Sequence, residues 1–385
     1  EGGIAEAVTK MALGNNIGAE LSLETDDLFK SSYLSVLIEI PSKVDADFIL
    51  KPVGGKIIGR TSESPYLKCG SVTISLKDAT AKITGVLEDV FPVNADKAYK
   101  TAVNETYHAK TVKKAKVSIA KPRVLIPVFP GTNCEYDSQR AFEKAGGEVE
   151  IFIFKNYNSD VIHQSIDKMA ELINQSQIIM IPGGFSLGDE REGSGKYIAN
   201  VLSNSKIADS IMNLLANRDG LMLGICNGFQ ALIKVGLVPY GEIRPMKGDS
   251  PTLTFNDIGR HQSKIVRTRI SSSLSPWMSG VNVGDIISVP ISHGEGKFVC
   301  SKEDLRQLLK NGQVASQYVN YDGNATYDIN FNPNGSYNAV EGITSPDGRI
   351  LGKMGHNERY TPNTFINVPG NYDSKIFESG IKYFK

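Results

Sequence analysis

The sequence predicts an α/β protein: a mostly parallel sheet with helices on both faces, preceded by a smaller α+β domain. The first observation is the length of 385 residues, which exceeds one ordinary domain and suffices for two cores. The second is a regular alternation of strand-like and helix-like segments from residue 124 onward. The third is a lysine-rich stretch over 108–123 with little apolar periodicity. We place the boundary there, which gives domains 1–117 and 118–385.

Composition excludes several classes of protein. Forty-two basic residues balance 42 acidic ones, so no overall field recruits nucleic acid or an anionic membrane. We interpret the lysines of 108–123 as a solvated linker, with an anion-binding patch as the alternative. Apolar runs are strand-sized, so no membrane span is predicted. The four cysteines, Cys69, Cys134, Cys226 and Cys300, form no C-x-x-C pair, which fits a reducing, cytoplasmic setting.

The first domain combines helix and strand signals. Apolar residues recur at helical spacing over 4–12, and the apolar run over 33–40 is typical of a strand closed by a proline. Further predicted elements are short strands over 56–58 and 71–76 and a helix over 79–90. The chain opens on a helix-like segment without an initiator methionine or a charged leader. We therefore expect a fragment of a longer chain and not a signal peptide.

The second domain follows a β-α-β pattern. Strands are predicted over 124–129, 149–154, 178–182 and 221–225, and helices over 138–144 and 161–174. Such alternation predicts a parallel sheet covered by helices on both faces. Ligands of these sheets bind beyond the carboxyl ends of the strands. The loops that follow residues 129, 182 and 225 are therefore the candidate site.

The segment 224–228, Gly-Ile-Cys-Asn-Gly, places Cys226 between a predicted buried strand and a predicted helix. This is the G-x-nucleophile-x-G pattern with cysteine in the serine position. The flanking glycines permit the tight turn that lifts the side chain above the sheet. At a helix N-terminus, unpaired amides and the dipole favour thiolate over thiol. A buried structural cysteine is the alternative, but this context favours a nucleophile.

The loop after the strand at 178–182 begins with Gly183, Gly184 and Phe185. Paired glycines allow the backbone to present N–H groups to a ligand. This loop can therefore supply one half of an oxyanion hole, and the amide of Asn227 can supply the other half. A plain glycine turn is the alternative, because two adjacent glycines are weak evidence when taken alone.

His356 and Glu358 stand two residues apart, after a hairpin-like segment. In an extended chain both side chains project to the same side, so Glu358 can accept from one ring nitrogen of His356 while the other faces outward. This is the base and orienter half of a nucleophilic triad. A chance surface pair is one alternative. Metal ligation is another, but no third ligand at suitable spacing is evident, and we predict no metal site.

Together these motifs resemble class I glutamine amidotransferases, whose triad is Cys-His-Glu in that order. Two segments, 129–135 (Phe-Pro-Gly-Thr-Asn-Cys-Glu) and 292–298 (Ser-His-Gly-Glu-Gly-Lys-Phe), are similar to the glutaminase domain of the phosphoribosylformylglycinamidine synthase family of purine biosynthesis. The start of the chain, 2–7, resembles the C-terminal half of the AIR synthetase-like module of that family. The resemblance implies a flavodoxin-like fold for 118–385 and a synthetase-type fold for 1–117.

The resemblance also implies a function, that of an ATP-dependent C–N ligase. The Cys226 thiolate would form a glutamyl thioester with L-glutamine, with His356 as acid and base and Glu358 orienting His356. Released ammonia would reach the synthetase module, built with domains upstream of this chain, which converts formylglycinamide ribonucleotide into the amidine. That module would use ATP and Mg²⁺, and this chain would hold only part of its site. The glutaminase itself would need no cofactor.

Other residues have roles by resemblance or position. Gln230 resembles a glutamine-site residue of the family, and we interpret His293 and Glu295 as accessory residues that contact glutamine, line the domain interface or shape the ammonia route. Cys134 is interpreted as structural or substrate-adjacent. Three alternatives remain open for the whole chain: another class I amidotransferase, a cysteine peptidase-like protein on the same fold, and a regulatory domain with a silent cysteine.

Overall fold

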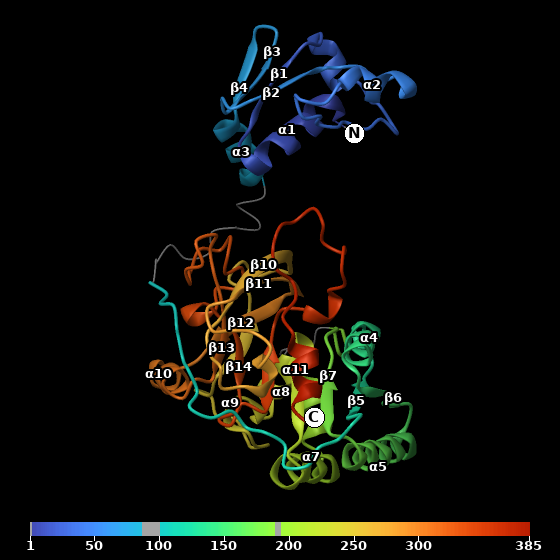
Figure 1. The fold of residues 1–385 in the computed structure, drawn as a ribbon, viewed down its shortest axis with the longest axis vertical. Coiled ribbons are helices and arrows are strands. Elements are labelled where there is room, and N and C mark those ends of the chain that lie inside the picture. Colours follow the sequence, from blue (N-terminus) through green and yellow to red (C-terminus); the bar gives the residue numbers. More distant parts are fainter. Residues whose placement is uncertain (1, 87–100, 189–193) are drawn as a thin grey trace. The chain divides into compact units, whose positions relative to one another are not determined.

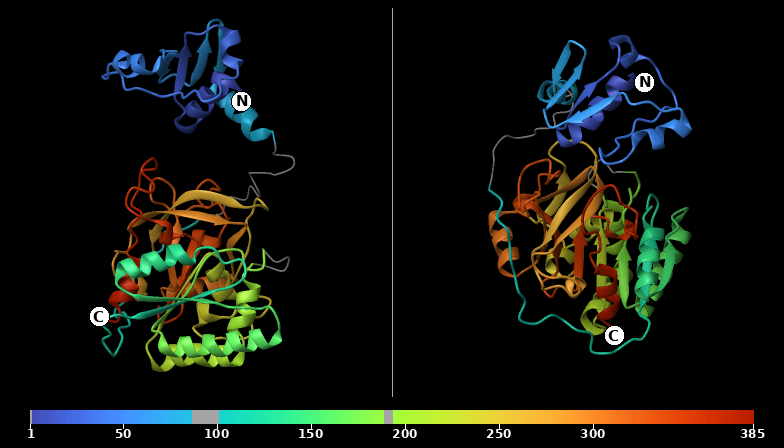
Figure 2. Two further views of the ribbon diagram at one scale, coloured as in Figure 1. Left: turned by 90° about the vertical axis from the view of Figure 1, so that its right-hand side faces the viewer. Right: turned by 45° about the horizontal axis from the view of Figure 1, so that its top comes forward.

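The protein forms two compact units in a computed structural model that describes residues 2–86, 101–188 and 194–385. The first unit spans Glu1–Pro92 and the second spans Val93–Lys385. Figures 1 and 2 show the elements of each unit coloured along the chain. Within the described ranges, no helix combines the length and apolar character that crossing a membrane requires.

The first unit has the predicted α+β composition. Its four-stranded sheet has the order β2-β1-β3-β4, in which β1 runs antiparallel to β2 and parallel to β3. The strands are β1 (Gly18–Leu21), β2 (Gly59–Ser62), β3 (Tyr66–Cys69) and β4 (Val72–Ser75). The helices are α1 (Gly3–Asn15), α2 (Ala46–Leu50) and α3 (Leu76–Gly85), with 3-10 turns η1 (Thr25–Phe29) and η2 (Lys51–Val53). Its likeness to a synthetase module stays a prediction.

The strand predicted over 33–40 is wrong. The segment is neither helix nor strand, and it contains a turn in which the N–H of Ser35 donates to the carbonyl of Ser32 at 3.2 Å. Leu34 lies in the left-handed region, with φ of 64°. A strand needs hydrogen bonds from a neighbouring strand, and an apolar run contains no information about whether that neighbour exists.

Two other predicted boundaries in the first unit shift by a few residues. The strand predicted over 56–58 is β2, three residues later. The helix predicted over 79–90 begins at Leu76, because the hydroxyl oxygen of Ser75 caps it by accepting from the N–H of Asp78 at 3.0 Å. The predicted end of this helix, residues 87–90, lies outside the described residues.

The second unit is built on a nine-stranded sheet with the order β11-β10-β13-β14-β15-β8-β7-β5-β6. Its strands are β5 (Arg123–Val128), β6 (Glu148–Ile153), β7 (Ile178–Ile181), β8 (Leu221–Ile225), β10 (Gln262–Ile270), β11 (Ile286–His293), β13 (Val314–Tyr318), β14 (Val340–Thr344) and β15 (Ile350–Lys353). A separate pair joins β9 (Thr252–Phe255) to β12 (Glu295–Val299). All four strands predicted before residue 226 are confirmed, within one residue at either end.

The expectation of a mostly parallel sheet holds for only half of it. From β15 through β8, β7 and β5 to β6 the described neighbours run parallel, whereas from β15 through β14, β13 and β10 to β11 they run antiparallel. Parallel neighbours need a long crossover, and the sequence before residue 226 supplies helices for it. After that point β10 pairs with β11 through residues 271–285 and β14 pairs with β15 through residues 345–349, and neither connection contains an α-helix that would carry the chain back for a parallel pair.

Helices cover the parallel half on both faces, as predicted. They are α4 (Glu135–Ala145), α5 (Ser159–Gln175), α6 (Lys196–Leu202), α7 (Ser205–Asn217), α8 (Asn227–Lys234) and α11 (Ile376–Lys382), with α9 (Leu237–Tyr240) and α10 (Lys302–Lys310) nearby. The crossovers β5-α4-β6 and β6-α5-β7 run in opposite directions along the sheet. Because such crossovers are right-handed, α4 and α5 lie on opposite faces. The helix contacts are consistent with this arrangement, because α4 packs against α11 whereas α5 packs against α7.

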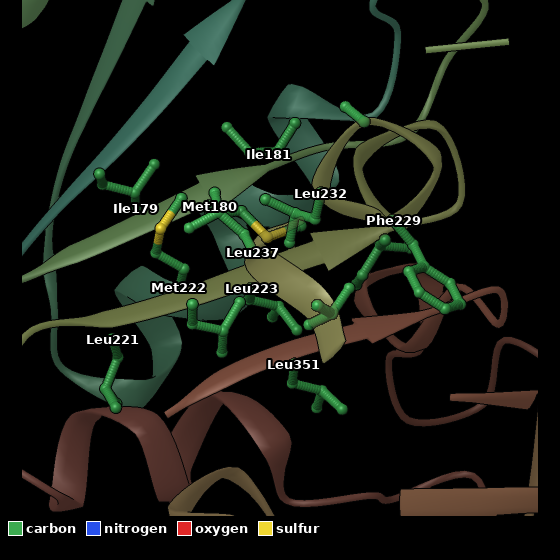
Figure 3. Packing of buried hydrophobic residues seen from close by; sticks show 14 of the residues in the cluster. Ile179, Met180, Ile181, Leu221, Met222, Leu223, Phe229, Leu232, Leu237 and Leu351 are labelled. Carbon is green, nitrogen blue, oxygen red and sulfur yellow. The ribbon is translucent and has the colours of Figure 1, made fainter. Parts of the chain in front are cut away.

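The core explains why the central strands are almost wholly apolar. Figure 3 shows Ile179, Met180 and Ile181 of β7 beside Leu221, Met222 and Leu223 of β8, with Phe229 and Leu232 of α8 packed against them. All of these side chains are fully buried. A parallel strand covered on both faces cannot alternate with polar residues, so the run of apolar letters in the sequence is the expected signature.

The boundary between the units falls upstream of the predicted 117/118, at Pro92/Val93. Described residues 101–119 lie along the second unit as a strap. The N–H of Val103 donates to Asn338 Oδ1 at 2.9 Å, that of Tyr107 to the Ser271 carbonyl at 2.8 Å, and that of Ile119 to Phe384 at 2.7 Å. These bonds are long-range in sequence, so the lysine-rich composition that suggested a linker gave no sign of them.

We expect a chain cut to begin at residue 118 to be less stable than one cut to begin at 101. The shorter chain loses residues 101–117 and with them the N–H bonds of Val103, Tyr107 and Glu105, the last of which donates to Gln317 Oε1 at 2.8 Å. Each net hydrogen bond contributes about 1 kcal/mol. A loss of about 3 kcal/mol lowers the melting temperature of a unit of this size by about 6–12 °C. Calorimetry of both chains measures the difference, and equal melting temperatures would show that the strap does not stabilise the unit.

Candidate active site

Cys226 sits at a strained turn between β8 and α8. Its backbone has φ of 51° and ψ of −105°, and its side chain is 4% exposed. The neighbouring glycines are required by space. A Cβ on Gly228 would lie 2.0 Å from the Ile181 carbonyl oxygen, and one on Gly224 would lie 2.6 Å from Leu232. The nucleophile-elbow geometry predicted from the sequence is therefore present.

The thiol of Cys226 is protonated in this environment. Burial raises its pKa far above the ordinary value, and the charges of Cys134 and Glu358 act in the same direction. The Arg359 guanidinium and the N–H of Asn227 oppose this shift without overcoming it. The predicted preference for thiolate at the helix N-terminus is thus outweighed by desolvation. The thiol points at the carbonyl oxygen of Ser292, with Sγ and O 3.6 Å apart.

His356 and Glu358 form a buried pair. His356 Nδ1 lies 2.5 Å from Glu358 Oε1, and the two residues are 1% and 3% exposed. They do not lie in an extended segment as predicted, because Asn357–Arg359 forms a 3-10 turn, η5. This turn still brings the Glu358 carboxylate within hydrogen-bond distance of the His356 ring, as an extended segment would. With Nδ1 facing a carboxylate, Nε2 is the nitrogen that can accept a proton, and no described group hydrogen-bonds to it.

Strand register brings the nucleophile and the histidine to one edge of the sheet. β8 and β15 are parallel neighbours in which Ile225 pairs with Lys353, and the N–H of Cys226 donates to the Lys353 carbonyl at 2.8 Å. Cys226 and His356 therefore follow paired positions on adjacent strands. Within the described residues, the Cys226 thiol donates to the Ser292 carbonyl and His356 Nε2 has no hydrogen-bond partner, so no hydrogen bond joins Cys226 to His356.

The glycine loop after β7 packs against the histidine. A Cβ on Gly183 would lie 2.6 Å from His356 Cε1, so only glycine leaves room for the ring there. Gly184 has φ of 147° and forms a bridge with Thr132. The N–H of Phe185 is committed to the Gly131 carbonyl at 2.8 Å. Outside helices and strands, the N–H groups of Gly184 and Asn227 donate to no backbone carbonyl among the described residues.

A chain of buried amides braces the elbow. Asn227 Nδ2 donates to Gln230 Oε1 at 2.9 Å, and Gln230 Nε2 donates to the backbone carbonyl of Glu295 at 2.6 Å. The Glu295 carboxylate accepts from the N–H of Ser194 at 2.9 Å, and Asn227 Oδ1 accepts from that of Ser186 at 3.2 Å. Gln230 and Glu295 thus tie α8 to β12, and the side-chain amide of Gln230 is already occupied.

His293 is buried beside the same site. It is 2% exposed, and burial lowers the pKa of its ring to about 3, with His356 and His261 adding to the shift. The ring is therefore neutral. Neither ring nitrogen has a hydrogen-bond partner among the described residues, and a Cβ on Gly296 would lie 2.4 Å from the ring. The residue before it, Ser292, holds the Cys226 thiol.

Sequence reasoning missed the closeness of Cys134 to the pair. Its Sγ lies 3.9 Å from His356 Nδ1 and accepts from Arg359 Nη2 at 3.4 Å, and burial raises its pKa to about 11. In the described part of the chain, Cys134, His356 and Glu358 could hold a metal ion, since their ligand atoms lie within 4.8 Å of one another. The Arg359 cation beside the same sulfur disfavours that. The one sequence feature that pointed to this arrangement is the basic residue Arg359 directly after Glu358, since its guanidinium bonds to the Cys134 sulfur.

The second unit of the chain is similar to proteins that are already known. Residues 121–384 match the family described as CobB/CobQ-like glutamine amidotransferase domain. "Phosphoribosylformylglycinamidine synthase subunit PurQ" of Methanococcus maripaludis is 37% identical over 244 residues, which cover 62% of this chain and 82% of that relative. The protein of the same name from Koribacter versatilis is 30% identical over 253 residues, covering 66% and 94%. A structure described as "Structure of PurLQS from Thermotoga maritima" matches with 29% identity, coverage of 69% and 100%, and a TM-score of 0.49.

We expect alkylation of Cys226 by iodoacetamide to be slow at pH 7 and to rise about tenfold per pH unit between pH 7 and 9, because only the thiolate reacts. Its raised pKa keeps the thiol protonated across this range. Peptide mass spectrometry measures the rate, with the urea-unfolded chain as the control in which the thiol has its ordinary pKa. A rate at Cys226 that is already level above pH 7 would contradict burial as the dominant effect.

Proposed function

This chain belongs to the family of CobB/CobQ-like glutamine amidotransferase domains, and from that premise we propose that its second unit hydrolyses L-glutamine to glutamate and ammonia with Cys226 as the nucleophile. The observation that carries the proposal is the register of β8 and β15. It sets the elbow cysteine and the buried His356–Glu358 pair at the same edge of the sheet. Nucleophile, base and orienter are the three parts that amide hydrolysis by a thiol requires.

The first step needs a rotation of the thiol. Cys226 Sγ turns from the Ser292 carbonyl toward His356 Nε2, which accepts its proton, and the sulfur forms a bond to the side-chain carbonyl carbon of glutamine. The carbonyl oxygen takes up the electron pair as an oxyanion, and the N–H groups of Gly184 and Asn227 meet it. Glu358 holds the proton on Nδ1 in place and stabilises the imidazolium. A site that lacks water strengthens each of these interactions.

The second step releases ammonia. The tetrahedral intermediate collapses, the C–N bond breaks, and His356 Nε2 returns its proton to the departing nitrogen, leaving a thioester on Cys226. A water molecule then gives a proton to His356 and attacks the thioester carbon through a second oxyanion. Breakage of the C–S bond releases glutamate, and the proton on Nε2 restores the thiol. Protein groups alone carry every proton transfer.

We further propose that the ammonia serves the synthesis of formylglycinamidine ribonucleotide. The support is that relatives of 30–37% identity are named as phosphoribosylformylglycinamidine synthase subunits. The word subunit implies an assembly, and the partner here would be a synthetase module that uses ATP and Mg²⁺, with the first unit, Glu1–Pro92, as its piece. Free cysteines agree with a cytoplasmic setting.

Replacing Cys226 with alanine should remove glutamine hydrolysis and leave ammonia-dependent synthesis by the complete enzyme unchanged, since only the nucleophile is lost. Glutamate release and amidine formation, measured with glutamine and then with an ammonium salt, test this. Cys300→Ala is the matched control, because Cys300 is a partly buried thiol of the same unit outside the site. Glutamine-dependent turnover by Cys226→Ala would show that the nucleophile is another group.

A further inference from the structure

A buried ion pair lies directly behind the proposed catalytic residues. Lys353, the last residue of β15, places its Nζ 3.0 Å from Glu341 Oε1 of the neighbouring strand β14, and the side chains are 4% and 0% exposed. Removing two charges from water is unfavourable unless geometry and further hydrogen bonds compensate. An apolar pair would fill the same space. We therefore expect this buried ion pair to have a role other than filling space.

Both charged groups hold the same residue, Gly355, which precedes His356. Glu341 Oε1 accepts from the N–H of Gly355 at 2.7 Å, and Lys353 Nζ donates to its carbonyl at 3.0 Å. The second carboxylate oxygen accepts from the Ser316 hydroxyl at 2.5 Å. Hydrogen bonds to charged groups are roughly twice as strong as neutral ones. Both backbone polar groups of Gly355, its N–H and its carbonyl, are thus held by a charged side chain.

The same lysine also holds the nucleophile. Its backbone carbonyl accepts from the N–H of Cys226 at 2.8 Å, at the residue where φ is positive and the turn is strained. Lys353 therefore connects the nucleophile to the histidine. Its backbone carbonyl holds Cys226, and its side chain, together with that of Glu341, holds Gly355, the residue before His356. The N–H of His356 is held in turn by the Pro290 carbonyl at 2.8 Å.

We propose that Lys353 and Glu341 are positioning residues that set the separation of Cys226 and His356. This rests on the proposed glutaminase function. Among the described residues, neither side chain hydrogen-bonds to the Cys226 sulfur or the His356 imidazole, so the pair acts through the backbone at 226 and 355. A displacement of about 1 Å between reacting groups can lower a rate about 100-fold, and the pair limits that displacement while leaving glutamine binding to other residues.

The test uses the full chain and a neutral double variant, Lys353→Met with Glu341→Gln, which leaves no unpaired buried charge and keeps an acceptor for Gly355. We expect a melting temperature close to that of the wild type, a kcat for glutamine hydrolysis lowered about 10–100-fold, and a nearly unchanged KM. A pair that only stabilised the fold would leave kcat of the folded protein intact. Ser316→Ala, a milder change, should lower kcat about two- to fivefold through a less constrained Glu341.

The matched control is Asp347→Asn with Arg349→Met. It removes an ion pair of 2.6 Å just before the opposite end of β15, and it should leave kcat unchanged. A folded Lys353→Met/Glu341→Gln variant with wild-type kcat overturns the inference. If that variant does not fold, Ser316→Ala decides, and an unchanged kcat there overturns it equally. A wild-type chain that hydrolyses glutamine no faster than Cys226→Ala would instead refute the proposed function.

Discussion

The site depends on one parallel pairing, that of β8 with β15. The two strands lie more than a hundred residues apart in sequence, yet Ile225 pairs with Lys353, and the N–H of Cys226 donates to the Lys353 carbonyl. A shift of one residue in this register would turn the following side chains to the other face of the sheet. Leu221, Leu223 and Ile225 of β8 belong to the same buried hydrophobic cluster as Ile350 and Leu351 of β15, which surrounds this pairing.

Glycines around this pairing allow close approaches that any side chain would prevent. Gly183 leaves room for the ring of His356, and Gly228 allows α8 to approach the Ile181 carbonyl. The resulting closeness excludes water, which raises the pKa of Cys226 and makes a nearby base necessary. The resting thiol turned toward Ser292 and the protonated state of Cys226 are therefore two consequences of one dense, dry environment. In the proposed mechanism, the first step is therefore the transfer of the Cys226 proton to His356.

Much of this could be predicted from the sequence where the signal is local. The glycines around Cys226 and the apolar letters of β7 and β8 determine turn and strand through their nearest neighbours. The proximity of His356 to Glu358 was also predictable, although the turn that achieves it was not. The antiparallel half of the sheet, the strap over 101–119 and the Lys353–Glu341 pair were not predicted. Each depends on contacts between distant segments, which no local pattern contains.

The central claim is that the sulfur of Cys226, and not that of Cys134 nearby, reacts with glutamine under the control of His356. Rapid acid quenching of the complete enzyme during turnover, followed by peptide mass spectrometry, tests it most directly. We predict a glutamyl adduct on the peptide that contains Cys226, absent when His356 is replaced by alanine. An adduct on the peptide that contains Cys134, or an adduct at Cys226 that forms equally well without the imidazole, would contradict the account.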